Sequence, residues 1–331
     1  MIRHLLAVTA AFGLAAPAWA QSGSSATVPV FPARAETVGP IEILELRPNL
    51  HLLVGPAGSN AVVHSGPEGV LIVDTMTAEL GGAVVSAIQR LSNRPILQIV
   101  STHSDLDHVG GNEAVRKAGA HFSTANTRDG GGAGILAFEN TLHRMSADGS
   151  PHPRYGWPTD SFFVDKKDLF LNGEPVQVLH QPAAHTDGDA MVHFRKSDVL
   201  VTGDVFTPNR YPVIKLDEGG SINGLIDGLN RILDIAVPAF NEEGGTIIIP
   251  GHGRICDESD VSDYRDMVTI VRDRVKAMVD AKATLEQVKA ARPTQDYDGV
   301  FSTQAYTGDM FVEAVYRSLA PAPAAPAGGR R

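Results

Sequence analysis

The chain has 331 residues, of which 43% are hydrophobic and 20% are charged, and its formal net charge is −10. This hydrophobic content is enough for a large buried core, so a disordered chain is excluded. The acidic balance offers no basic surface for nucleic acid or for an anionic membrane, so we expect a small-molecule substrate and no nucleic-acid partner. The oligomeric state stays open.

The first 20 residues have the pattern of a secretory signal peptide. Arg3 provides a positive start, residues 5–16 are apolar, and residues 18–20 form a small-x-small cleavage sequence. An uncleaved membrane anchor is disfavoured, because the apolar run is shorter than the roughly 20 residues that a membrane span needs. We therefore expect a periplasmic or secreted protein with no membrane attachment after cleavage. Cys256 is the only cysteine, which excludes an intramolecular disulfide and a cysteine-rich metal site.

Residues 21–40 are rich in Ser, Pro, Gly and Ala and predict a flexible lead-in. Short β-rich segments separated by Pro/Gly turns then predict a meander of strands. These strands are expected at Ile41–Leu46, Leu50–Val54, Asn60–His64 and Val70–Asp74. Apolar residues at helical spacing predict a helix over about 78–91, and the β-branched run Ile96–Val100 predicts a buried strand after it.

Residues 119–124 predict a further strand, but periodicity is lost from Thr127 to Asp160, where Gly, Pro, His and Asn are frequent. Long segments without secondary structure inside a compact domain are usually functional lids or disordered. Two interpretations stay open for this segment: a lid that borders the active site and a passive insertion. His143 and His152 are its candidate substrate contacts.

The second half again alternates strands and helices. Strands are expected at Val176–His180, Ala190–Phe194, Val199–Thr202 and Thr246–Ile249, and helices at about 221–235 and 259–281. Thr284-Leu-Glu-Gln287 is a capping box that predicts a shorter helix ending before Pro293. Residues 320–331 are rich in Pro, Ala and Gly and predict a disordered tail. The pattern favours an α/β fold over residues 41–319, with two packed sheets, helices outside them and further helices at the C-terminus.

The segment Ser101–Asn112 places two histidines and two aspartates close together, directly after a predicted strand. Ligands bind at the carboxyl ends of strands in open α/β sheets, so the position fits a binding site. Histidine and aspartate are metal ligands, and four of them in one turn would be costly to desolvate without a cation. The four residues are His103, Asp105, Asp107 and His108.

Three more candidate ligands each follow a β-rich run and lie beside a glycine or a turn residue. They are His185, Asp204 and His252. Together with the four residues above they are numerous enough to hold two metal ions. A Ser-His-Asp triad is disfavoured, because the chain contains no Gly-x-Ser-x-Gly sequence.

Five blocks of the sequence, taken together and in chain order, resemble the metallo-β-lactamase superfamily. The blocks are Asp74 at a strand end, Thr-His-x-Asp-x-Asp-His-x-Gly-Gly over 102–111, His185, Gly203-Asp204 and Pro250-Gly-His-Gly253. The resemblance spans about Leu50 to Gly253. It implies an αββα sandwich whose site lies at one edge, between the two sheets.

The resemblance also implies a role for each candidate ligand. His103, the residue at position 105 and His185 would hold the first metal, Asp107, His108 and His252 the second, and Asp204 would bridge the two. Asp74 would lie behind the ligands and order their loop, with an ordinary strand-ending turn as the alternative.

Asp105 departs from the usual pattern of the family, His-x-His-x-Asp-His, in which a histidine stands at this position. Three interpretations stay open: Asp105 binds the first metal, it points away and leaves that site weak or empty, or the protein is a metal-poor relative. An acidic residue here resembles the flavodiiron branch, and carboxylates favour harder ions such as iron or manganese. We expect two divalent ions, with zinc as the first expectation and iron or manganese as alternatives.

The resemblance implies a hydrolase that uses a metal-bound hydroxide, with Asp107 as a ligand and as the catalytic residue that orients the nucleophile. A small ester, thioester, lactone or β-lactam is the expected substrate. Arg210 and Tyr211 follow the bridging aspartate closely, so they either line the pocket or form a rigid turn under a helix. Two other functions stay open: an iron-dependent oxidoreductase, which Asp105 favours, and a non-catalytic metal-binding relative.

Overall fold

The computed structural model describes residues 35–120, 131–238 and 244–320. The predicted signal peptide, residues 21–34 of the predicted lead-in and residues 321–331 of the predicted tail lie outside these ranges, as does most of the strand expected at 119–124. Among the described residues, no helix has the length and apolar character needed to cross a membrane.

The N-terminal half forms a sheet of eight strands, which follow one another across the sheet in chain order. The strands are β1 (Ala35–Val38), β2 (Ile41–Arg47), β3 (Leu50–Val54), β4 (Asn60–Ser65), β5 (Val70–Val73), β6 (Ile96–Val100), β7 (Gly134–Phe138) and β8 (Asp160–Phe162). Neighbours from β1 to β5 are antiparallel, and neighbours from β5 to β8 are parallel. Because β5 and β6 are parallel, their carboxyl ends lie at the same edge of the sheet.

A second sheet has five strands in the order β13-β12-β11-β10-β9. The strands are β9 (Lys166–Leu171), β10 (Glu174–Gln181), β11 (Asp189–Phe194), β12 (Val199–Gly203) and β13 (Ile247–Pro250). β9 to β12 pair antiparallel, and β12 pairs parallel with β13. Since antiparallel neighbours alternate in direction, β10, β12 and β13 all end at one edge.

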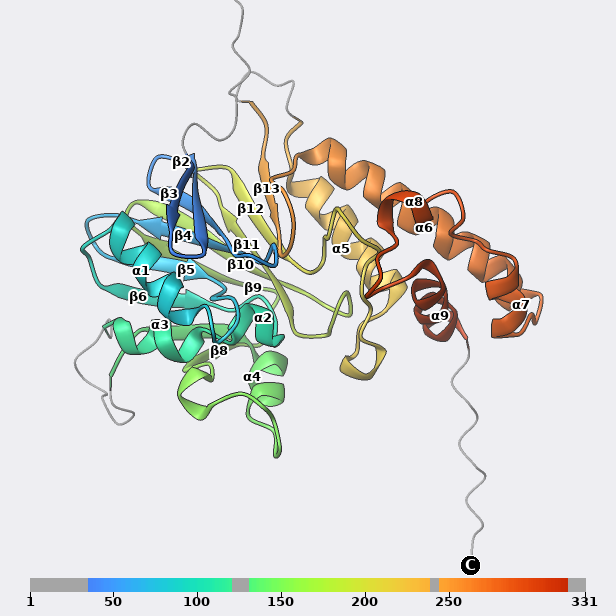
Figure 1. The fold of residues 1–331 in the computed structure, drawn as a ribbon, viewed down its shortest axis with the longest axis horizontal. Helices are drawn as coiled ribbons and strands as arrows, with labels where there is room; N and C mark the ends of the chain where they lie inside the picture. The colour runs from blue at the N-terminus through green and yellow to red at the C-terminus, as the bar shows by residue number, and fades with distance from the viewer. Residues whose placement is uncertain (1–34, 121–130, 239–243, 321–331) are drawn as a thin grey trace, which may run out of the picture. The chain divides into compact units, whose positions relative to one another are not determined.

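Helices cover the outer face of each sheet (Figure 1). The helices of the described residues are α1 (Gly81–Leu91), α2 (Leu106–Val109), α3 (Asn112–Ala118), α4 (Glu139–Met145), α5 (Ile222–Ile235), α6 (Glu258–Asp280), α7 (Leu285–Ala290), α8 (Asp298–Phe301) and α9 (Gly308–Leu319), with 3-10 turns η1 (Arg154–Gly156) and η2 (Leu216–Glu218). One hydrophobic cluster joins α1 and α3 to the first sheet, a second lies between the sheets, and a third joins α5, α6 and α9 to the second sheet. The predicted αββα sandwich is therefore confirmed.

Alternation along the strands explains why both faces of the first sheet are covered. Val70 and Ile72 belong to the cluster with α1, whereas Leu71 and Val73 belong to the cluster between the sheets. Successive side chains of a strand point to opposite faces, so a strand with apolar residues at every position is buried on both sides.

Local signals at the helix ends agree with the structure. Thr284 and Gln287 form the predicted capping box at the start of α7. Ser221 accepts a hydrogen bond from the backbone N–H of Gly224 at the start of α5. These contacts satisfy backbone donors that have no partner within the helix, which fixes where each helix begins.

Two predictions about secondary structure were wrong, and one strand was not predicted. The described part of Thr127–Asp160 is not structureless, because β7 and α4 lie within it and β7 is a largely buried strand of the first sheet. Ala35–Val38, expected in the flexible lead-in, pairs with β2 as β1. β9 was not predicted, because its sequence Lys-Lys-Asp-Leu-Phe-Leu has three charged residues followed by three apolar ones and lacks the alternation of a strand; it is an edge strand whose pairing comes from β10.

Candidate metal centre

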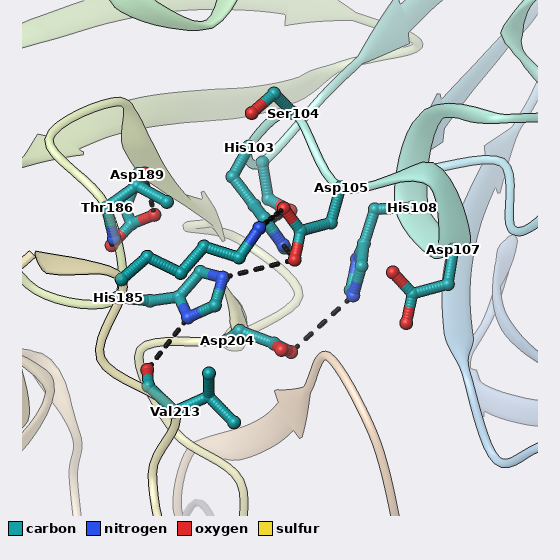
Figure 2. Close-up of polar contacts among 12 residues, drawn as sticks. His103, Ser104, Asp105, Asp107, His108, His185, Thr186, Asp189, Asp204 and Val213 are labelled. Atoms are coloured by element: carbon teal, nitrogen blue, oxygen red, sulfur yellow. Dashed lines mark hydrogen bonds and ion pairs between the residues drawn. The ribbon is translucent and has the colours of Figure 1, made fainter. Parts of the chain in front are cut away.

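The candidate ligands follow the carboxyl ends of five strands, which lie at one edge of the sandwich. Asp74 follows β5, the segment 103–108 follows β6, and three further residues follow strands of the second sheet. Those three are His185 after β10, Asp204 after β12 and His252 after β13. Figure 2 shows side chains from both sheets converging around Asp204.

One group of donor atoms comprises His103, His185 and Asp204, whose ligand atoms all lie within 4.8 Å of one another. Asp105 joins this first group, because its Oδ2 lies 3.3 Å from His185 Nε2 and 3.7 Å from His103 Nε2. Of the interpretations for Asp105, the one in which it points away from the site does not agree with this placement.

A second group comprises Asp107, His108 and His252. His252 Nε2 lies 3.1 Å from Asp107 Oδ2 and 3.2 Å from His108 Nε2. Asp204 Oδ1 lies 3.5 Å from His108 Nε2 and 3.8 Å from His252 Nε2, although Asp204 also belongs to the first group. The structure therefore places Asp204 between the two groups, as the bridging role requires.

Asp74 orients a histidine of each group: His108 directly and His103 through the Thr102 hydroxyl. It is 2% exposed, and its Oδ1 accepts a hydrogen bond of 2.8 Å from the backbone N–H of Thr102. Its Oδ2 lies 2.8 Å from His108 Nδ1 and accepts the Thr102 hydroxyl at 2.7 Å. The same hydroxyl oxygen lies 3.0 Å from His103 Nδ1. Because a carboxylate only accepts, His108 must donate from Nδ1, and its Nε2, which faces His252 and Asp204, is the nitrogen that could bind a metal.

The ring of His185 is likewise oriented through its Nδ1, here by a backbone carbonyl of another loop. Its Nδ1 donates to the Val213 carbonyl at 2.9 Å, so its Nε2, which faces Asp105, is the nitrogen that could bind a metal. The turn after it is closed by Asp189, which is buried and accepts from the Thr186 backbone N–H at 2.9 Å and from the Thr186 hydroxyl at 2.6 Å.

Two glycines allow the loops of the second sheet to approach the site closely. Gly203 has a φ of 53°, in the left-handed region that favours glycine. A Cβ on Gly251 would lie 2.2 Å from Asp204 Oδ1 and 2.8 Å from His108 Cε1. Asn60 of the first sheet then holds the loop that carries His252, since its side-chain amide donates to the Pro250 carbonyl at 2.9 Å.

Neighbouring histidines and aspartates in the site shift one another's pKa values, and each favours the charged form of the other. Burial lowers the pKa of His108, but Asp74 and Asp204 raise it more, so the pKa lies well above its usual value. Burial raises the pKa of Asp204, but His108 and His252 hold it well below its usual value. The pKa of His185 is raised to about 9 in spite of burial, chiefly by Asp105, and that of Asp107 is lowered to about 2 in spite of burial, chiefly by His252. Positive charge is thus strongly favoured at this edge.

The donor set fits divalent metal ions. Among the described residues, His103 Nε2 and Asp204 Oδ1 are buried and have no hydrogen-bond partner, although buried polar atoms are normally paired. Two such atoms amid imidazole and carboxylate donors are what a site for borderline-soft to hard cations requires. The residues present could therefore hold two ions that share Asp204.

A cavity of about 570 Å³ borders the ligands Asp105 and Asp107. Its wall includes the turn 147–152 and the exposed Leu106. His152 lies in this wall, with its Nε2 2.6 Å from the Ser104 carbonyl oxygen, whereas His143 is exposed on α4 and does not line the cavity. Within the segment Thr127–Asp160, the turn 147–152 therefore borders the candidate site.

Arg210 and Tyr211 have different surroundings. The Arg210 guanidinium lies 3.1 Å from Asp204 Oδ2, and Arg210 lines a smaller cavity of about 220 Å³ together with His252. Tyr211 is fully buried, and its hydroxyl donates to the Thr294 carbonyl and to Asp298 near the C-terminal helices. Tyr211 therefore does not line the pocket; it fastens the loop after β12 to the C-terminal helices.

Two supporting residues were missed by the sequence reasoning. Asp189 follows His185 by four residues. The sequence Thr186-Asp-Gly-Asp189, which is typical of a turn closed by a side-chain carboxylate, could have identified it. Lys215, whose ammonium contacts Asp105 Oδ1 and lies 3.1 Å from Glu218 Oε1, has no local motif. Burial lowers the pKa of Lys215, but Asp105 and Glu218 raise it more. Only the need to balance the charge of Asp105 could have suggested a lysine.

Comparisons with known proteins cover most of the chain. The sequence model of the metallo-beta-lactamase superfamily matches residues 54–252. A probable metallo-hydrolase of Streptococcus pyogenes is 24% identical over 212 residues, which are 63% of this chain and 86% of that protein. A linear primary-alkylsulfatase of Pseudomonas sp. is 26% identical over 169 residues, which are 42% of this chain and 32% of that protein.

Solved structures share the fold. A stereoselective inverting sec-alkylsulfatase from Pseudomonas sp. has a TM-score of 0.62 at 17% identity over 83% of this chain and 49% of that one. A metallo-beta-lactamase from Pontibacter korlensis has a TM-score of 0.55 at 17% identity over 69% of this chain and 99% of that one. This chain thus spans about half the length of the sec-alkylsulfatase.

Proposed function

The chain belongs to the metallo-beta-lactamase superfamily, a family of metal-dependent hydrolases, and from this premise we propose that it is an exported enzyme with two metal ions. The observation that carries the proposal is the pair of ligand groups that share Asp204. Zinc is the ion we propose, because four of the seven donors are imidazoles, with iron or manganese as alternatives. Export rests on the signal-peptide pattern of the first 20 residues.

The residues divide the work of hydrolysis among them. When bound, the two ions supply Lewis-acid polarisation of the scissile group and lower the pKa of a water molecule. Asp107 lies between His252 and the cavity and has a pKa near 2, so at neutral pH it is an ionised acceptor that can orient the attacking water. Leu106 gives the cavity an apolar wall, against which the organic part of a substrate can pack.

A small ester, thioester, lactone or β-lactam is the substrate class that we propose. The cavity of about 570 Å³ has the size of an ordinary small-molecule site, which supports a small substrate. Hydrolysis of each of these bonds needs an activated water and a polarised carbonyl, and metal ions held by these His and Asp residues would supply both.

A second candidate is hydrolysis of an alkyl sulfate ester, and one observation favours it. The structural match to the sec-alkylsulfatase covers 83% of this chain, against 69% for the metallo-beta-lactamase from Pontibacter korlensis. The sulfatase match thus extends over more of the chain than the lactamase match does, and the family match itself ends at residue 252.

The experiment that tests the proposal combines metal analysis with a substrate panel. Purified protein should contain two equivalents of metal and should turn over at least one chromogenic carboxylic ester, thioester, lactone, cephalosporin or alkyl sulfate. Chelation should abolish that turnover, and added zinc should restore it. A protein that is saturated with metal yet inactive on the whole panel would favour the non-catalytic relative, and a coloured protein that takes up only iron would favour the oxidoreductase.

A further inference from the structure

The first ligand group contains a carboxylate, Asp105, with a lysine directly against it. We propose that Lys215 is a positioning residue for the metal centre: it fixes one oxygen of Asp105 and balances its charge, so that the other oxygen serves as a ligand of the first metal. The inference rests on the proposed two-metal site and assigns a role to a residue that lies outside every segment that carries a candidate ligand.

The contacts of Asp105 separate its two oxygens. Oδ1 receives the Lys215 ammonium, whereas Oδ2 faces His185 Nε2 at 3.3 Å and His103 Nε2 at 3.7 Å. The His103 nitrogen is one of the buried atoms that lack a hydrogen-bond partner among the described residues. The ammonium thus contacts Oδ1, and the contacts to the two histidine nitrogens are made by Oδ2.

Lys215 is held in place by the same loop that fixes His185. The backbone N–H of Lys215 donates to the His185 carbonyl at 3.0 Å, and the Lys215 carbonyl accepts from the Gly220 N–H at 2.9 Å. The Val213 carbonyl accepts from His185 Nδ1. We call residues 213–220 the clasp. Because the clasp grips the backbone and the ring of His185 together, the lysine and the ligand histidine have a fixed relation to each other.

The Lys215–Asp105 contact balances part of the negative charge of the site. Three ligand carboxylates, Asp105, Asp107 and Asp204, surround the centre, and Asp189 is buried beside His185. Besides the histidines, an arginine and a lysine among the described residues oppose them: Arg210 pairs with Asp204, and Lys215 pairs with Asp105. The Asp105 and Lys215 side chains are 19% and 26% exposed, so water screens their attraction only in part. A neutral residue at 215 would leave Asp105 Oδ1 without its cationic partner, while Oδ2 would still face His185 and His103.

The test measures the metal affinity of each site, by competition with a chelator and by the absorption spectrum of the cobalt-substituted protein. Lys215→Met should weaken the first site by roughly 10–100-fold, the usual effect of losing a residue that orients a ligand, and should leave the second site almost unchanged. Lys215→Gln should do the same, because it keeps polarity without charge, and Lys215→Arg should recover most of the affinity. Lys289→Met is a matched control: Lys289 is 30% exposed and pairs with Glu313 on the C-terminal helices.

The effect of Lys215→Met on the metal affinity of the first site should change sign when Asp105 is replaced by a neutral ligand. In an Asp105→His background, Lys215 no longer has a carboxylate to balance, and its charge only repels the metal. Adding Lys215→Met to Asp105→His should therefore strengthen zinc binding at the first site. A structural role of Lys215 in holding the clasp would instead weaken binding in both backgrounds, and that result would overturn the proposal.

Two further outcomes separate this inference from the proposed function. If Lys215→Met raises only KM while the affinity of both sites is unchanged, Lys215 contacts substrate in the cavity and the positioning role is wrong. If wild-type protein binds no metal at either site, the proposed metal centre itself fails, and the inference fails with it.

Discussion

The metal centre has an inner support and an outer support, and they differ in burial and in charge. The inner support is Asp74, which is 2% exposed and contacts Thr102 and His108 through three hydrogen bonds. The outer support is the Lys215–Asp105 pair, which borders the cavity and whose lysine belongs to the clasp. The inner support is part of the packed end of a sheet, whereas the outer one depends on a loop and on charge balance. We therefore expect the inner support to contribute to folding and the outer one to tune a single metal site.

Asp204→Ala should have the largest effect, because it removes the one side chain that both groups share. Metal content should fall from two equivalents to one or fewer, and turnover should fall by roughly 100-fold or more, beyond the effect of losing an orienting residue. Elemental analysis and steady-state rates on the active substrate would measure this. Retention of two tightly bound ions would contradict the bridging position of Asp204.

Asp74→Asn should break the inner support. The amide cannot accept from Thr102 and from His108 as the carboxylate does, so His108 loses its orientation and the affinity of the second site should fall by roughly 10–100-fold. Buried donors left unsatisfied should also lower the free energy of unfolding by about 1–3 kcal/mol. Urea denaturation of the metal-free protein checks the second effect, which Lys215→Met should not show. Equal destabilisation by both variants would remove the distinction between the supports.

Metal binding should depend on pH in a way that reflects the histidines. A raised pKa means that the metal must displace a proton, so binding weakens as pH falls. For His185, with a pKa of about 9, the apparent affinity of the first site should rise about tenfold per pH unit up to that pH and then level off. Calorimetry in buffers with different ionisation enthalpies would count the released protons. Affinity that is constant between pH 6 and 9 would contradict a protonated His185 in the metal-free protein.

Arg144→Met should have the smallest effect of the four. Arg144 pairs with Asp187 and Glu218 at the rim of the cavity, where its side chain is 22% exposed. Ion pairs that water reaches contribute about 1 kcal/mol or less, so metal affinity should change less than about fivefold. Chelator competition on the variant would measure this. A change as large as that of Lys215→Met would show that the outer support extends beyond the lysine.

Local patterns in the sequence predicted much of the fold. The run Ile96–Val100 and the capping box of α7 are recognisable because strand periodicity and helix caps are local properties. β7 was missed, because Gly134–Phe138 begins with glycine and has one β-branched residue, where Ile96–Val100 has three, and its pairing comes from its parallel partner β6.

The sequence by itself determined which side chains could be ligands, since His and Asp residues directly after strands fall at one edge of a parallel arrangement. Only the tertiary structure decided how they group, because the two groups draw on strands of both sheets. It also separated Arg210, which reaches Asp204, from Tyr211, which is buried under the C-terminal helices. The surroundings of Asp105 were decided in the same way: its partner Lys215 comes from a loop of the other half of the chain, and a contact between residues so far apart leaves no periodic pattern in the sequence.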